Sequence, residues 1–62
     1  MMDAKYYLLL STGDIITPEL ELHPFEDYSV MWQYLQDRLF MDRIAWYQIY
    51  WGDVLMMQKV LH

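Results

Sequence analysis

Glu19, Glu21 and His23 are the residues whose types and spacing best suit metal binding. Alternate residues of a strand project from one face, so two carboxylates and an imidazole would lie side by side there. A flat sheet edge supplies neither a further ligand nor the outer hydrogen bonds that hold a metal in place. Charges that protect an edge strand from aggregation explain the same residues with fewer assumptions, so we expect neither a metal site nor a cofactor.

Catalysis by acid–base pairs or nucleophiles has little basis in this chain. Glu26 and Asp27 are adjacent carboxylates, but acid–base catalysis needs a pocket that moves their pKa values apart. Cysteine is absent, and neither histidine stands near a serine or threonine in an arrangement typical of a catalytic triad. Both glycines belong to turn signals, which leaves no phosphate-binding loop. We therefore expect no catalytic residues and a protein that is not an enzyme.

The acidic residues are unevenly distributed along the chain. Nine acidic and four basic residues give a net charge of -5, and residues 13–27 hold five acids without any lysine or arginine. An acidic surface repels phosphate, so we expect no direct binding of DNA or RNA. The same charges would steer the chain toward a basic protein surface. We predict a partner-binding acidic edge formed by Asp14, Glu19, Glu21, Glu26 and Asp27.

The aromatic residues indicate a second contact element. The chain is 18% aromatic and 56% hydrophobic, which is more apolar surface than one core of 62 residues is expected to bury. Tyrosine and tryptophan are enriched among the residues that anchor protein interfaces. We predict partner contacts from Trp46, Tyr50 and Trp51, with a small core padded by large rings as the alternative.

The first elements that must position these residues form a predicted hairpin. The apolar run Tyr6–Leu10 is followed by Gly13 and Asp14, and glycine reaches the positive φ that a type II′ turn requires. A two-residue loop at this point pairs Thr12 with Ile15.

The second strand of this hairpin alternates glutamate and leucine over residues 19–22. With the predicted register, Leu9 lies opposite Pro18, and both leucines share a face with Leu9 and Tyr7 while the glutamates point away. Pro18 cannot donate a ladder hydrogen bond, so we expect this strand at an edge of the sheet.

The segment from Pro24 to Met41 predicts a helix. Pro24 suits its first position, and Glu26 and Asp27 suit its first turn because the helix dipole favours negative charge there. Arg38 complements the carbonyl end, and Asp42 is the expected exit residue. Spacings of three and four define the stripe expected to meet the sheet: Tyr28, Met31, Trp32, Leu35 and Leu39. The alternative is a longer helix that continues to about residue 51 and leaves only one hairpin.

A second hairpin is predicted from Arg43–Trp51, the Gly52-Asp53 turn and Val54–Leu61. Pairing Trp51 with Val54 divides the side chains between two faces, which a slip of one residue would exchange. We predict that the helix packs against the face that carries Ala45, Tyr47, Ile49, Trp51, Val54, Met56, Gln58 and Val60. The other face is expected to be exposed and to make contacts; it carries Ile44, Trp46, Gln48, Tyr50, Leu55, Met57, Lys59 and Leu61.

These elements predict one small α+β domain over residues 1–62. The order ββαββ is that of a β-grasp fold: a four-stranded sheet with one helix packed across it and with the first and last strands parallel in the middle. The apolar run after Lys5 is too short for a signal-peptide core, and no stretch approaches the ~20 residues of a membrane span. We therefore expect a cytoplasmic protein, or one of the host cytoplasm if the chain is viral, with no membrane partner.

The expected function is that of a small acidic protein–protein interaction module. Its partner would be a larger protein, and one concrete form is an inhibitor that imitates nucleic acid and occupies the basic surface of a nucleic-acid-processing complex, as phage anti-defence proteins do. The alternative is a structural homodimer in which the exposed sheet face or the helix stripe is buried against a second copy.

Overall fold

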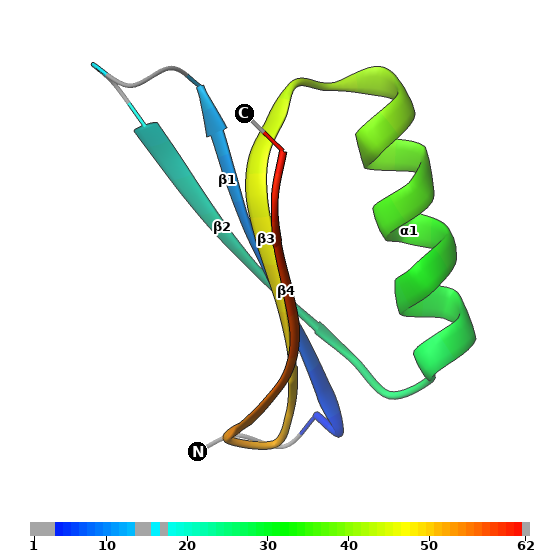
Figure 1. Ribbon diagram of the computed structural model, residues 1–62. Coiled ribbons are helices and arrows are strands. Elements are labelled where there is room, and N and C mark those ends of the chain that lie inside the picture. Colours follow the sequence, from blue (N-terminus) through cyan, green and yellow to red (C-terminus); the bar gives the residue numbers. More distant parts are fainter. Residues whose placement is uncertain (1–3, 14–15, 17, 62) are drawn as a thin grey trace.

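Four strands and one helix make up the fold. The computed structural model describes residues 4–13, 16 and 18–61. The elements are β1 (Tyr6–Gly13), β2 (Pro18–Phe25), α1 (Tyr28–Met41), β3 (Ile44–Trp51) and β4 (Val54–Val60). The strands form one antiparallel sheet in the order β2-β1-β3-β4, and α1 packs against one of its faces (Figure 1). The predicted α+β class and ββαββ order, with one helix on a four-stranded sheet, are confirmed.

The position of β4 differs from the β-grasp detail of the prediction. β1 pairs with β3 in antiparallel orientation, and β4 lies at the edge, so the first and last strands are not a central parallel pair. Both strands of the second hairpin are apolar enough for a central position. β3 takes it, so Ile44, Tyr47 and Ile49 are buried in the core, whereas every residue of β4 is exposed.

The first hairpin has a longer loop than predicted. Gly13, with a φ of 84°, pairs with Pro18, so Thr12 lies opposite Glu19 and not opposite Ile15. Ile15 and Asp14, of the predicted turn, lie outside the described residues. Leu9 is opposite Leu22 instead of Pro18. The observed register therefore differs from the predicted one by an even number of residues, so the residues predicted to share a face still do so.

Strand β2 runs through Pro24 to Phe25, so the prediction that Pro24 begins the helix is wrong. β2 is an edge strand, as predicted, and an edge is where a strand tolerates proline. The helix begins at Tyr28 after the N-cap Asp27, whose Oδ1 accepts a 2.9 Å hydrogen bond from the backbone N–H of Ser29. Glu26 and Asp27 therefore precede the first turn.

The helix ends at Met41, and its cap is the predicted exit residue Asp42, whose N–H donates to the Arg38 carbonyl at 2.8 Å. β3 begins at Ile44, so the alternative of a helix that continues to about residue 51 is wrong. In the part of the chain that the structure describes, no helix has the length and apolar character needed to cross a membrane.

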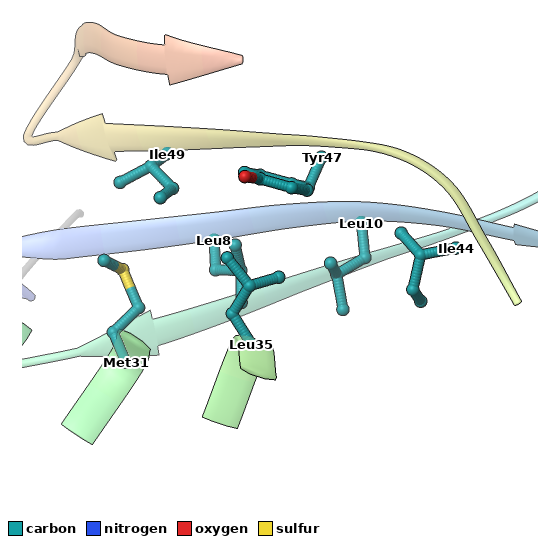
Figure 2. Packing of buried hydrophobic residues seen from close by; sticks show 7 residues of the cluster. All are labelled: Leu8, Leu10, Met31, Leu35, Ile44, Tyr47 and Ile49. Atoms are coloured by element: carbon teal, nitrogen blue, oxygen red, sulfur yellow. The ribbon is translucent and has the colours of Figure 1, made fainter. Parts of the chain in front are cut away.

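The core lies between α1 and the sheet (Figure 2). Helix residues Met31 and Leu35 point toward Leu8 and Leu10 of β1, and β3 adds three further side chains: Ile44, Tyr47 and Ile49. Of the predicted helix stripe, Met31 and Leu35 are fully buried and Leu39 is partly buried against the cluster. Tyr28 and Trp32 remain exposed and stack on each other at the edge of the helix, with ring planes 7° apart.

A β-bulge changes the faces of β4. Trp51 pairs with Val54 across Gly52, which has a φ of 62°, as the turn signal predicts. The register then shifts between Ile49 and Tyr50, so that Met57, and not Met56, lies opposite Ile49. Beyond the bulge the prediction for β4 is therefore wrong: Met57 and Lys59 share the helix side, and Gln58 and Val60 point away from it.

The predicted faces of β3 hold for Tyr47, Ile49 and Trp51, which lie on the helix side. Ile44 is an exception because it is buried in the core. A second register shift, between Ser11 and Thr12 of β1, places Ile44 opposite Thr12 and on the helix side.

Candidate protein-binding surface

The sheet face opposite α1 is covered by no other described element (Figure 1). We call it the open sheet face. The leucines of β2 share it with Tyr7 and Leu9, as predicted, but it is the side away from the helix. Its accessible side chains come from all four strands: Leu9, Leu20, Leu22, Trp46, Gln48, Tyr50, Leu55, Gln58 and Val60.

No charged side chain of the strands lies on the open sheet face. The charged residues within the four strands are Glu19, Glu21 and Lys59, and the registers place all three on the helix side. Leu20 is 65% exposed and Leu22 is 54% exposed. A chain with a net charge of -5 therefore presents one uncharged face that is rich in exposed apolar side chains.

The polar groups of the open sheet face bond to one another. The Tyr50 hydroxyl donates to Gln48 Oε1 at 2.7 Å, and Gln48 Nε2 donates to Gln58 Oε1 at 3.1 Å. This chain of hydrogen bonds leaves fewer polar groups that need a partner when the face is covered. A binding protein would therefore meet a largely apolar surface with part of its hydrogen bonding already satisfied.

Two of the three predicted aromatic contacts lie on this face. Trp46 and Tyr50 are half-buried, and each is two residues from Gln48 along β3. Trp51 is exposed but lies on the helix side, opposite Tyr6. A shallow hollow of about 200 Å³ lies along the β3–β4 pair and is lined from both sides of the sheet, by Trp46, Gln48, Gln58 and Val60 and by Tyr47 and Lys59. It is smaller than the ~300–1,000 Å³ typical of small-molecule sites.

The predicted acidic edge contains a network that ties α1 to β2. Arg38 contacts Glu21 through two hydrogen bonds, from Nη1 to Oε1 at 2.7 Å and from Nη2 to Oε2 at 2.9 Å. Nη1 also donates to the Tyr34 hydroxyl at 2.8 Å. His23 Nε2 lies 2.8 Å from Glu21 Oε1 and 3.2 Å from the Tyr34 hydroxyl. Arg38 and, to a smaller degree, His23 lower the pKa of Glu21 to about 2.

The five predicted acids do not come together at one site among the described residues. Glu21 is bound by Arg38, and Asp27 is the helix cap, where hydrogen bonds from Ser29 lower its pKa. Glu19 and Glu26 are exposed, but one lies at the start of β2 and the other follows its end. Asp14 lies outside the described residues.

The alternating acidic and histidine residues of β2, which could have formed a metal site, take part in a different interaction. Glu21 and His23 do lie side by side, but the cation that they face is the Arg38 guanidinium. In the described ranges, no group of three histidine, aspartate or glutamate side chains is arranged to hold a metal ion. Arg38 was expected only to complement the helix end, and its contact with Glu21 spans 17 residues of sequence, which no local pattern reveals.

Comparison with known proteins adds no further description of this surface. No protein-family model, curated protein or solved structure matches the chain. The function is therefore inferred from the geometry and chemistry of the open sheet face.

Proposed function

We propose that the chain is a small protein–protein interaction module that binds a larger protein through the open sheet face. The observation that carries the proposal is the separation of charge from apolar surface. All charged strand residues face the helix side, and Leu20, Leu22, Leu55 and Val60 are exposed on the other side. Large contiguous apolar patches are uncommon on soluble monomers and are typical of interfaces.

The acidic residues around the open sheet face favour a partner whose contact surface has a basic border. Glu19 and Glu26 flank the exposed leucines of β2, and Asp53 lies in the turn between β3 and β4. Charges at a rim act mainly on the rate of association, because they stay hydrated. Inhibition of a nucleic-acid-processing complex is the form of this proposal in which the basic border belongs to a nucleic-acid groove.

The test is site-specific crosslinking in cells that produce the protein. A photoreactive phenylalanine analogue at Leu22 samples the open sheet face, and the same analogue at Phe40, which is 91% exposed on α1, is the matched control. We expect one discrete protein to be captured from Leu22 and not from Phe40. Equal capture at both positions, or none at Leu22, would contradict the proposal.

The basic border has its own test once that protein is purified. Raising the salt concentration from 50 to 300 mM is expected to slow association with little change in dissociation, because screening acts on exposed rim charges. Replacing Glu19 and Glu26 by glutamine should reduce this dependence. A rate of association that does not depend on salt would contradict the basic border and would be compatible with the apolar contact.

A further inference from the structure

Strand β4 has a composition that does not match its position. All seven of its residues are exposed, and five of them are large and apolar: Val54, Leu55, Met56, Met57 and Val60, with exposed fractions from 41% to 74%. They are distributed over both faces of the strand. Strands that are apolar on both sides are normally covered on both sides. Here the strand is at the edge of the sheet.

The two edges of the sheet differ in how they are protected. β2 carries two prolines and two glutamates, which are devices that block pairing with another strand. β4 has no proline, and its only charge is Lys59. The Leu61 N–H donates inward to the Ala45 carbonyl at 2.8 Å. By the alternation of an antiparallel ladder, Gln58 and Val60 therefore direct their backbone groups to the outer edge.

We propose that β4 pairs in antiparallel orientation with β4 of a second copy of this chain. The product is a two-fold dimer with one continuous sheet, in which the two open sheet faces become neighbours on the same side. This inference does not depend on the proposed function, since it uses the edge of the sheet and not its face.

Charge complementarity identifies the second copy as the occupant. Asp53 precedes β4, and Lys59 lies near its end. Antiparallel pairing of identical strands brings the Lys59 end of one copy to the Asp53 end of the other, at both ends of the contact. Parallel pairing would instead bring like charges together. Residues 54–60 carry no acid, so copies with a net charge of -5 repel each other less at this edge than at β2, which carries Glu19 and Glu21.

The first test is the mass in solution, measured by light scattering after size exclusion over a hundredfold dilution. We expect twice the 7.7 kDa of the single chain, with dissociation on dilution. Gln58→Pro removes an outward N–H, while its matched control Gln58→Thr keeps it; both lose the amide contact with Gln48. Gln58→Pro should raise the dissociation constant at least tenfold and Gln58→Thr less than threefold. A monomeric wild type, or a Gln58→Pro dimer of unchanged affinity, would overturn the inference.

The second test does not rely on proline and so covers the case in which Gln58→Pro fails to fold. Asp53→Lys and Lys59→Asp each create like charges at the paired ends, and the double variant restores unlike charges. Each single variant is expected to weaken the dimer several-fold, and the double variant should recover to within about twofold. A double variant as weak as the singles would exclude antiparallel pairing of β4.

The two proposals fail separately. Crosslinking from Leu22 in a chain that is monomeric at all concentrations would support the proposed function and overturn the dimer. A dimer that responds to the charge exchange, without capture of another protein from Leu22, would support the dimer and contradict the proposed function.

Discussion

Arg38 of α1 binds Glu21 of β2 at two points, with N···O distances of 2.7 and 2.9 Å. Both side chains are only partly exposed, and Tyr34 and His23 complete the network. The helix is thereby held over the edge strand by charge-assisted hydrogen bonds, next to a core formed with β1 and β3.

Glu21→Gln is expected to lower the free energy of unfolding by about 1 kcal/mol, because it removes the charge from a two-point contact that is partly shielded from water. The measurement is urea unfolding at pH 7. Glu19→Gln, on the same strand and face but exposed, is the matched control and should change stability by less than about 0.5 kcal/mol. Equal effects of the two substitutions would show that the network does not stabilise the fold.

The contribution of Glu21 should disappear in acid. Its pKa is about 2 in the folded chain and near 4.5 without its partners. The unfolded chain therefore takes up the proton at a higher pH, and acid favours unfolding between these two values. The stability difference between wild type and Glu21→Gln should be constant above about pH 5.5 and shrink as the pH falls from 4.5 toward 2. A difference that stays constant down to pH 2 would contradict the lowered pKa.

Asp27→Ala should lower the melting temperature and the helical circular dichroism, because the Ser29 N–H loses its acceptor at the start of α1. Asp27→Asn keeps an acceptor oxygen at the same place, and we expect it to retain most of the wild-type melting temperature. If Asn is as damaging as Ala, the charge of Asp27 matters more than its role as a cap.

The two sheet faces should respond differently to loss of a leucine. Leu10→Ala creates a cavity in the core and is expected to cost about 2–5 kcal/mol, which is a large share of the stability of a small domain. Leu20→Ala, on the open sheet face, should cost less than about 1 kcal/mol in the monomer, since most of that side chain is already in water. Chemical denaturation of both variants at low protein concentration measures the contrast. Similar losses would mean that the open sheet face is covered in solution.

The order of the elements could be predicted because each one has a local signal. Gly52 between two apolar runs indicates a turn, and it does lie in one with a positive φ. The pairing partner of β1 has no such signal. β3 and β4 are both apolar, and the choice depends on Ile44, Tyr47 and Ile49 fitting beneath a helix whose position is itself set by the fold. The predicted helix start at Pro24 was wrong because a proline suits an edge strand as well as a first helical turn.

The surface was harder to predict than the fold. Trp46 and Tyr50 were predicted to share a face because each is two positions from Gln48, and alternation is a property of any strand. The pairing of Glu21 with Arg38 has no sequence period, so the acids of residues 13–27 were predicted as one edge although Glu21 and Asp27 have partners within the chain.

The bulge in β4 determines on which side of the sheet the one charged residue of this strand lies. Regular pairing from Trp51 and Val54 would place Lys59 opposite Trp46, on the open sheet face, whereas the bulge places it opposite Tyr47. Deletion of Met56 would remove the extra residue together with the bulge and leave Lys59 opposite Tyr47, so the strand can lose this residue without placing an ammonium group on the open sheet face. With all seven residues of β4 present, it is the bulge that keeps the single charge of this strand off the apolar surface.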